Sequence, residues 1–345
     1  MKDTNIDHNK FMLRCFELAL KGLGATYPNP LVGSVIVHQG TIIGEGWHHK
    51  AGEAHAEVNA INNVTQKKLL KESTLYVNLE PCNHYGKTPP CAQLIVKHKI
   101  PRVVIGTIDP FKEVNGSGIT TLEQAGIEVM MSSLGKEAKQ INQRFFTFHQ
   151  KKRPYIVLKW AQSIDGFIAP LTKNRKSKSP VFLSSKEDQV LVHQWRKEEE
   201  AILVGAQTII DDNPRLTTRW ISGRHPIRVI LDPRGRIPQD AQVFSSDSPT
   251  HHLTYPTLGM RGNESPEKFL LRSLEYLYHQ NINSVLIEGG KKTIDFFIKA
   301  SLWDEARVFK SPIKLTEGIP APEGISLKFS KQKNLIIVQP PKKQL

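Results

Sequence analysis

Short apolar runs alternate with amphipathic segments along the whole chain, and this alternation limits the possible folds more than any other feature of the sequence. The runs "LVGSVIV" and "TIIGEGW" predict two strands joined by a hairpin turn at Gln39-Gly40. Between the later runs "TLYVNLE" and "RVVIGTI" lies the helical pattern "CAQLIVKHK". Residues 9–23 predict another helix, with Asn9 as its cap. Strands that alternate with helices predict a three-layered α/β domain.

The alternation is interrupted once, at Lys151-Lys152-Arg153, where a helical segment ends and the strand "YIVLKWA" begins. A chain of 345 residues is also too long for one ordinary core. We therefore expect one domain over residues 1–150 and a second over residues 151–345, where "AILVGA", "IRVILD" and "SVLIEGG" repeat the strand pattern. The segments 172–180 and 243–266 are expected to be loops or insertions.

The cysteine count and the hydropathy pattern bear on the cellular compartment. Apolar runs stay well short of the roughly 18 residues that a membrane-spanning helix needs, and "MKDTNIDHNK" lacks the apolar core of a secretory signal. Three cysteines form no disulfide framework, and an odd count fits a reducing compartment. We therefore expect a cytoplasmic protein with no membrane segment, in which two thiols are free to act as thiolates.

The net charge of +14 is concentrated in the second half of the chain. Residues 1–150 hold 16 Lys and Arg against 13 Asp and Glu, or +3, whereas residues 151–345 hold 31 against 20, or +11. Such a surplus is compatible with nucleic acid, with an anionic small molecule, or simply with a soluble surface. No basic stripe interleaved with aromatic residues is present, and the first half is nearly neutral, which disfavours nucleic acid.

The stretch "NLEPCNHYGKTPPC" places Cys82 and Cys91 nine positions apart, each directly after a proline. Upstream, "GEAHAEVNAI" places His55 at the start of a predicted helix. One imidazole and two thiolates are ligands suited to Zn²⁺, and three protein ligands leave a fourth position open, as in catalytic zinc sites. Pro81 and Pro90 fix φ before each thiol, and a helix N-terminus favours the thiolate of Cys91. The sequence therefore predicts a catalytic zinc site.

Glu57 lies two residues after His55 and is expected to transfer protons rather than to bind the metal. Zinc lowers the pKa of its bound water from about 15.7 toward about 7, which supplies hydroxide at neutral pH. Glu57 would then protonate the ring nitrogen and the leaving amine of an amidine-like substrate, so that ammonia departs. Zinc nucleobase deaminases use this arrangement with a Cys-x-x-Cys pair, whereas eight residues separate the two cysteines here.

These stretches resemble the bifunctional riboflavin-biosynthesis deaminase–reductase family. "TYPNPLVGSVIV", "GEGWHHKAGEAHAE" and "LEPCNHYGKTPPC" are similar to its deaminase motifs, including the long spacing between the cysteines. The resemblance implies a cytidine-deaminase-like zinc domain that converts 2,5-diamino-6-(5-phosphoribosylamino)pyrimidin-4(3H)-one to 5-amino-6-(5-phosphoribosylamino)uracil. It also implies four positions that face the base, ribose or phosphate of this substrate, namely Asn29, His48, His84 and Lys87.

The sequence contains neither a Gly-x-Gly-x-x-Gly fingerprint nor a P-loop: "GLGATY" at residues 22–27 lacks the last glycine and follows a helix, and "EGGKKT" has Val285 where the first glycine is required. "LKWAQSIDGFIA", "LVHQWRKEEEAILVGAQTIIDDNPRLTTR", "PIRVILD" and "IEGG" are nevertheless similar to the reductase half of the same family, whose fold resembles dihydrofolate reductase. The resemblance implies that NADPH is held at Ala161, Phe182, Thr208, Asp212 and Gly290. It implies that the ribosyl phosphate substrate is held at Arg196, Leu216, Arg219 and Glu288.

The implied reduction transfers a hydride from NADPH to C1′ of the opened ribose and gives a ribitylamino side chain. Glu288 and Asp212 are the ionisable candidates for its proton donor, and the sequence does not choose between them. The chain departs from the family pattern at three places, with Pro180 for serine, Phe182 for tryptophan and Lys291-Lys292 for Pro-Thr. Either the two lysines strengthen the binding of the NADPH 2′-phosphate, or the substitutions leave the reductase half inactive.

Three functions stay open on these grounds. The leading hypothesis is a bifunctional enzyme that acts on one phosphorylated small molecule, without nucleic acid or membrane partners, and that forms a homodimer or larger homo-oligomer as the family suggests. The second is a nucleic-acid deaminase with an accessory binding domain. The third is a non-catalytic, zinc-stabilised interaction protein. Glu57 argues against the third, because a structural zinc site has no use for a proton shuttle.

Overall fold

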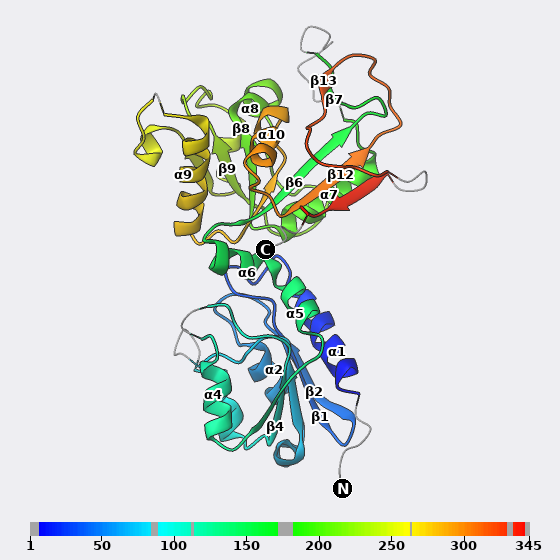
Figure 1. Ribbon diagram of the computed structural model, residues 1–345, viewed down its shortest axis with the longest axis vertical. Helices are drawn as coiled ribbons and strands as arrows, with labels where there is room; N and C mark the ends of the chain where they lie inside the picture. Colours follow the sequence, from blue (N-terminus) through cyan, green and yellow to red (C-terminus); the bar gives the residue numbers. More distant parts are fainter. Residues whose placement is uncertain are drawn as a thin grey trace. The chain divides into compact units, whose positions relative to one another are not determined.

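The computed structural model describes residues 7–83, 89–111, 114–171, 182–262, 264–329 and 334–341. The chain divides into two compact units, residues 1–151 and residues 152–345. Each unit has its own sheet, and Figure 1 shows helices flanking both sheets.

The first unit is built on a five-stranded sheet, whose strands are β1 (Gly33–His38), β2 (Thr41–Trp47), β3 (Thr74–Val77), β4 (Arg102–Ile105) and β5 (Glu128–Met131). Their order is β2-β1-β3-β4-β5. β1 pairs antiparallel with both β2 and β3, whereas β3, β4 and β5 run parallel. The predicted hairpin is confirmed, with positive φ at both turn residues, Gln39 and Gly40.

Helices cover both faces of this sheet, namely α1 (His8–Leu20), α2 (Ala56–Asn62), α3 (Cys91–Lys97), α4 (Ser117–Gln124), α5 (Gly135–Ile141) and α6 (Gln143–Lys151), with a 3-10 turn η1 (Lys67–Glu72). Apolar residues of α1 and α5 pack with Val35 and Tyr76 on one face of the sheet. Those of α2, α3 and α4 pack with Ile36 and Leu75 on the other face. The side chains of β1 and β3 therefore alternate between two cores, which gives the predicted three layers.

The N-terminal helix begins earlier than predicted, and its cap is a different residue. The carboxylate of Asp7 accepts hydrogen bonds from the N–H groups of Asn9 and Lys10, at 3.1 and 3.4 Å. The prediction of Asn9 as the cap is wrong, because Asn9 already lies within the first turn, two residues after the side chain that caps it.

α2 lies close to β2, and glycine makes this approach possible. A Cβ atom added to Gly44 would lie 2.5 Å from the carbonyl oxygen of Ala60, and one added to Gly46 would lie 2.6 Å from the nitrogen of Ala60. Neither residue can carry a side chain unless the helix moves. The contact bears on function because α2 begins directly after His55.

The second unit is built on a seven-stranded sheet, whose strands are β6 (Tyr155–Gln162), β8 (Ala201–Gly205), β9 (Ile227–Leu231), β10 (Thr250–Leu253), β11 (Ser284–Ile287), β12 (Glu305–Lys310) and β14 (Leu335–Val338). Their order is β10-β9-β8-β11-β6-β12-β14. All neighbouring pairs are parallel except β12 and β14. A separate two-stranded sheet joins β7 (Phe167–Ala169) to β13 (Ile319–Pro320).

β10 lies within residues 243–266, which were expected to form a loop. That prediction is wrong for "THHL", which lacks an apolar run but pairs in parallel with β9. The strand occupies a sheet edge, where fewer side chains need to be apolar. The other predicted loop, residues 172–180, lies outside the described residues.

Helices also cover both faces of the second sheet, namely α7 (Lys186–Glu198), α8 (Ala206–Asp212), α9 (Pro266–His279) and α10 (Lys291–Lys299), with 3-10 turns η3 (Gln242–Phe244) and η4 (Pro256–Leu258). α9 and α10 pack with Leu158 and Leu203, whereas α7 packs with Val157 and α8 with Ile202. Among the helices that the structure describes, none is both long and apolar enough to cross a bilayer.

Replacing Gly46 with alanine is expected to lower the free energy of unfolding by about 1–3 kcal/mol, because the added methyl group overpacks α2 against β2. Urea unfolding followed by circular dichroism measures this change. Gly262→Ala is the control, since no heavy atom lies within 4 Å of the Cβ atom that it adds. Its effect is expected to stay within about 0.5 kcal/mol. Equal effects of the two substitutions would contradict the close contact.

Candidate functional site

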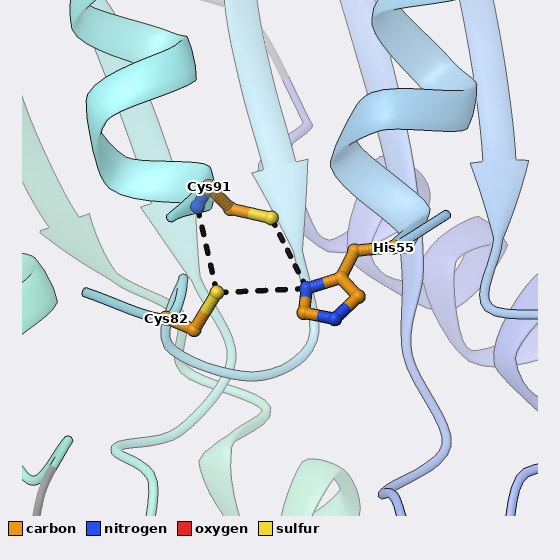
Figure 2. A group of neighbouring side chains, drawn as sticks. All are labelled: His55, Cys82 and Cys91. Carbon is orange, nitrogen blue, oxygen red and sulfur yellow. Dashed lines mark hydrogen bonds between the residues drawn. The ribbon is translucent and has the colours of Figure 1, made fainter. Parts of the chain in front are cut away.

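The three side chains that the sequence assigns to zinc lie together in the first unit. His55 is the N-cap residue of α2, Cys82 follows β3, and Cys91 is the first residue of α3. Cys82 Sγ and Cys91 Sγ lie 3.5 and 3.3 Å from His55 Nδ1, and the three donor atoms lie within 4.8 Å of one another. Figure 2 shows both sulfur atoms facing the same ring nitrogen. Three separate segments of the chain thus supply one cluster.

This donor set fits a zinc ion. With Zn–S of about 2.3 Å and Zn–N of about 2.0 Å, neighbouring donors of a tetrahedral site are about 3.5 Å apart, which matches the Sγ–Nδ1 separations. Thiolates and imidazole favour zinc over harder metals such as magnesium and calcium. Three protein donors leave one tetrahedral position for another ligand, which is typical of catalytic rather than structural zinc.

The backbone brings the two thiols into contact. Pro90 is the N-cap residue of α3 with φ of −58°, and the N–H of Cys91 donates to Cys82 Sγ at 3.4 Å. Hydrogen bonding with Cys91 lowers the pKa of the Cys82 thiol to about 4, and the same contact raises the pKa of the Cys91 thiol. The contact between the two thiols therefore favours deprotonation of Cys82 over that of Cys91.

Glu57 lies in the first turn of α2 and is 3% exposed. Burial raises the pKa of its carboxyl group, and the charge of His55 opposes this rise. The cluster of possible metal donors among the described residues does not include Glu57. A buried carboxyl group beside the metal donors, but not among them, is suited to proton transfer.

Asn29 and His48 lie beside the metal-donor cluster. The ring of His48 is 3% exposed and meets the ring of His55 edge-on, with 5.5 Å between centroids. His48 Nδ1 bonds to the carbonyl oxygen of Ala54 at 3.1 Å, and His48 Nε2 bonds to Asn29 Nδ2 at 3.0 Å. A neutral ring with its proton on Nδ1 satisfies both bonds, and burial lowers the pKa of His48 accordingly. The other two predicted substrate positions, His84 and Lys87, lie outside the described residues.

A buried ion pair lies at two predicted substrate positions of the second unit. Arg196, on α7, donates from Nε and Nη2 to the two carboxylate oxygens of Glu288, both at 2.8 Å. The side chains are 12% and 10% exposed. Burial opposes the ionisation of Glu288, but the charge of Arg196 and its hydrogen bonds lower the pKa of this carboxyl group to about 2. The pair ties α7 to the carboxyl end of the central strand β11.

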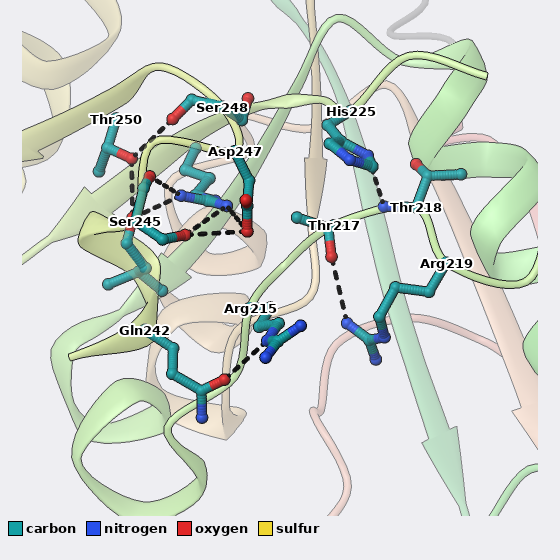
Figure 3. Close-up of polar contacts among 12 residues, drawn as sticks. Arg215, Thr217, Thr218, Arg219, His225, Gln242, Ser245, Asp247, Ser248 and Thr250 are labelled. Atoms are coloured by element: carbon teal, nitrogen blue, oxygen red, sulfur yellow. Dashed lines mark hydrogen bonds and ion pairs between the residues drawn. The ribbon is translucent and has the colours of Figure 1, made fainter. Parts of the chain in front are cut away.

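The loop after α8 brings two further guanidinium groups toward Arg196. Figure 3 shows Arg215, which donates from Nε to Gln242 Oε1 at 2.9 Å, and Arg219, which donates from Nη1 to Thr217 Oγ1 at 3.4 Å. Burial lowers the pKa of Arg219, and the positive charges of Arg196 and Arg215 lower it further. This concentration of positive charge suits a phosphate group.

The positions predicted for NADPH are brought together in part. Gly290, the N-cap residue of α10, donates its N–H to Thr208 Oγ1 at 3.2 Å. Asp212 ends α8, the helix that carries Thr208. The other two predicted positions lie on β6 and at the start of the described segment 182–262, namely Ala161 and Phe182. Phe182 is 59% exposed, and the remaining substrate position, Leu216, is 3% exposed with a φ of 55°.

Lys159 lies near the ion pair and was not predicted from the sequence. It lies on β6, where burial lowers the pKa of its ammonium group and the charges of Glu288 and Arg196 act on it in opposite directions. The sequence does carry a signal for it, because Lys159 is the single cation in the apolar run "YIVLKWA". A partly buried lysine with a lowered pKa in a central strand is typical of functional sites.

The first unit thus has the fold and donor set of a zinc-dependent nucleobase deaminase, followed in the chain by a second α/β domain. Residues 5–107 match the family model of the cytidine and deoxycytidylate deaminase zinc-binding region. Residues 154–334 match the RibD C-terminal domain.

Relatives match over nearly the whole chain. Riboflavin biosynthesis protein RibD of Aquifex aeolicus is 39% identical over 330 residues, which cover 91% of this chain and 89% of the relative. The protein of the same name from Bacillus amyloliquefaciens is 41% identical over 331 residues, with coverages of 92% and 87%. The chain belongs to the RibD family, as its motifs predicted, and is a bifunctional deaminase and reductase of riboflavin biosynthesis.

Solved structures give the same result for the fold. The crystal structure of the deaminase/reductase from Thermotoga maritima has a TM-score of 0.83 at 36% identity, and covers 96% of this chain and 98% of that chain. Acinetobacter baumannii RibD has a TM-score of 0.78 at 32% identity, with coverages of 94% and 92%. The predicted fold class is confirmed, with a cytidine-deaminase-like zinc domain followed by a dihydrofolate-reductase-like domain.

Replacing Glu288 with glutamine is expected to destabilise the second unit by about 3 kcal/mol near neutral pH, because Arg196 loses its buried partner. The folded-state pKa of Glu288, about 2, lies below the unfolded value. The pair therefore stabilises the fold above about pH 4.5, and this stabilisation is lost as the pH falls toward 2.

The difference in free energy of unfolding between the unsubstituted protein and Glu288→Gln should accordingly shrink as the pH is lowered from about 6 to about 3. Urea unfolding at each pH measures it. Glu267→Gln, at an exposed position of α9, is the control, and its effect on the free energy of unfolding near neutral pH is expected to stay within about 0.5 kcal/mol. A constant difference at all pH values would contradict the assignment of an ion pair.

Proposed function

We propose that the first unit deaminates 2,5-diamino-6-(5-phosphoribosylamino)pyrimidin-4(3H)-one, and that the second unit reduces the ribosyl group of the product to a ribityl group with NADPH. The observation that carries this proposal is the cluster of His55, Cys82 and Cys91, with Glu57 beside it, in a chain that continues into a RibD C-terminal domain. The Thermotoga maritima relative is named for both activities. We assign residues 1–150 to deamination and residues 151–345 to reduction.

In the deaminase, His55, Cys82 and Cys91 would hold the zinc ion. Bound zinc supplies Lewis-acid chemistry that makes water a nucleophile at neutral pH. The carboxyl group of Glu57 accepts a proton from the attacking water and gives it to the ring nitrogen, and a second transfer to the amine nitrogen releases ammonia. Asn29, held by His48, binds the pyrimidine at the rim of the site. The remaining contacts, to ribose and phosphate, are assigned to His84 and Lys87.

Replacing Glu57 with glutamine is expected to reduce ammonia release from the diaminopyrimidine by about 10²–10⁴-fold, because the amide cannot carry the proton. Zinc content, measured by atomic absorption, should stay at one ion per chain, because Glu57 is not among the metal donors. Glu53→Gln is the control, since Glu53 is an exposed carboxylate four residues upstream. Full activity in Glu57→Gln would refute the proton-transfer role, whereas loss of zinc would make Glu57 a ligand.

In the reductase, we assign the ribosyl phosphate to Arg196, Leu216, Arg219 and Glu288. Glu288 already neutralises Arg196. Arg219, whose Nη1 contact is to a neutral hydroxyl, is therefore the guanidinium that faces the phosphate, and Arg215 adds to the local positive charge. An arginine can bind a phosphate through two parallel N–H···O bonds.

NADPH supplies a hydride to C1′ of the opened ribose in its imine form. We assign the binding of NADPH to Ala161, Phe182, Thr208, Asp212 and Gly290. Hydride addition leaves the imine nitrogen in need of a proton, and Glu288 is a poor donor because Arg196 holds it as an anion. We propose that Lys159 Nζ gives this proton, because its charge interacts with that of Glu288 and burial lowers the pKa of its ammonium group; Asp212 stays the alternative donor.

Of the two lysines that replace Pro-Thr, only Lys292 is proposed to bind the NADPH 2′-phosphate. Lys291 Nζ is bound to Asp295 Oδ2 at 2.7 Å and to the carbonyl oxygen of Ala321 at 3.3 Å. Lys292, in the first turn of α10, is exposed close to the Gly290 turn.

Replacing Lys292 with alanine is expected to raise the KM for NADPH about tenfold and to leave the KM for NADH unchanged, because only NADPH carries the 2′-phosphate. Oxidation of each cofactor with the deaminated pyrimidine is followed by absorbance. Lys299→Ala, an exposed cation in the last turn of the same helix, is the control. An equal rise for both cofactors would contradict the phosphate contact. If the unsubstituted enzyme deaminates but oxidises neither cofactor, the reductase half is inactive.

A further inference from the structure

The buried carboxyl group of Glu80, two residues before Cys82, accepts four backbone hydrogen bonds and takes no part in the chemistry above. Oε2 accepts from the N–H groups of Asp109 and Gly116, at 3.2 and 3.0 Å. Oε1 accepts from those of Gly118 and Ile119, at 2.9 and 3.3 Å. The side chain is 3% exposed. One carboxyl group thus binds two segments of the chain that lie about 30 to 40 residues downstream of it.

Glu80 supplies the cap that α4 lacks in its own sequence. The first N–H groups of a helix have no partners within the helix, and the N-cap residue of α4 is Gly116, which has no side chain. Glu80 Oε1 reaches the N–H groups of the second and third residues of this helix, Gly118 and Ile119. A carboxylate at this position also complements the partial positive charge of the helix N-terminus.

The same contact fixes the peptide that leads to Cys82. The backbone N–H of Glu80 donates to the carbonyl oxygen of Thr107 at 2.9 Å. A Cβ atom added to Gly118 would overlap the carbonyl oxygen of Pro81, so the start of α4 is pressed against this peptide. Glu80 and Pro81 are therefore held by the chain that follows the neighbouring strand β4 and by the start of α4.

Cys82 depends on this support more than the other two donors do. His55 caps α2 and Cys91 begins α3, so the helices fix both residues. Cys82 lies in a segment without regular structure, and its carbonyl oxygen accepts from the N–H of Ala92 at 3.1 Å. We propose that Glu80 is a positioning residue for the metal centre, which holds Cys82 Sγ in place by binding the start of α4 to the Glu80–Pro81 peptide. This inference rests on the proposed zinc ligands.

The test compares the rates at which zinc leaves the full-length Glu80→Gln variant and the unsubstituted protein. In Glu80→Gln the side chain keeps one acceptor oxygen, and its NH₂ group faces two N–H donors, so half of the contact is lost. The variant is expected to bind one zinc ion per chain but to release it to an excess of a chromogenic chelator at least about tenfold faster than the unsubstituted protein. The cobalt-loaded variant should show altered thiolate-to-cobalt absorption.

Two further variants separate positioning from general stability. Val37→Ala removes buried apolar contacts from the same unit without touching the Glu80 contact, and its zinc release should be unchanged although its stability is lower. Gly118→Ala displaces Pro81 directly and should speed release as Glu80→Gln does; it replaces Glu80→Gln if that variant does not fold.

The outcomes distinguish this inference from the proposed function. If the unsubstituted protein holds zinc and both Glu80→Gln and Gly118→Ala release it at the same rate as that protein, the positioning role is refuted. The same conclusion follows if Val37→Ala releases zinc as fast as they do. If the unsubstituted protein binds no zinc at all, the proposed metal site itself fails.

Discussion

The deaminase site depends on one arrangement of the backbone, in which the N-terminal ends of α2 and α3 meet beside the carboxyl end of β3. His55 and Cys91 stand at the two helix starts, and Cys82 follows the strand. The helix starts therefore set the direction of the His55 and Cys91 side chains, whereas Cys82 lies in irregular chain and depends on contacts with other segments. The start of α3 favours a thiolate at Cys82, because the N–H of Cys91 donates to Cys82 Sγ. The glycines of β2 let α2 come close enough to fix His55 in this arrangement.

The second unit uses the corresponding part of its own sheet. In open parallel sheets, ligands bind beyond the carboxyl ends of the strands. Glu288 and Gly290 follow β11, and α8, which carries Thr208, follows the neighbouring strand β8. Arg196 comes from a helix instead and is fixed by its two hydrogen bonds to Glu288. This pair decides how much positive charge is left for a substrate, because Glu288 cancels the charge of Arg196 but not that of Arg219.

The sequence predicts those parts of the molecule whose residue types carry a chemical signature of their own. The metal donors could be predicted because each thiol follows a proline at a strand or helix boundary, and because zinc chemistry limits which residues can join them. The role of Glu80 could not be predicted from the sequence. Its partners lie up to 39 residues away and are backbone N–H groups, which do not depend on the residue type. Lys159 could be noticed in the sequence as a cation inside an apolar strand. Its position beside Glu288 and Arg196 could not be predicted, because these residues come from distant segments. β10 could not be predicted from its own residues either, because it forms by pairing in parallel with β9.

The charge of the second half becomes informative about its ligand only once burial is considered. Its surplus of 31 − 20 = 11 positive charges is compatible with a nucleic-acid backbone. Nucleic acids, however, bind cations that lie exposed along a surface. Arg196 is largely buried and its charge is paired with Glu288, so it offers little free charge to a polymer. The exposed arginines at this site, Arg215 and Arg219, gather around one buried ion pair instead of following a line along the surface. A single phosphate group suits such a local cluster, so the position of the cations, rather than their number, favours a phosphorylated small molecule over nucleic acid.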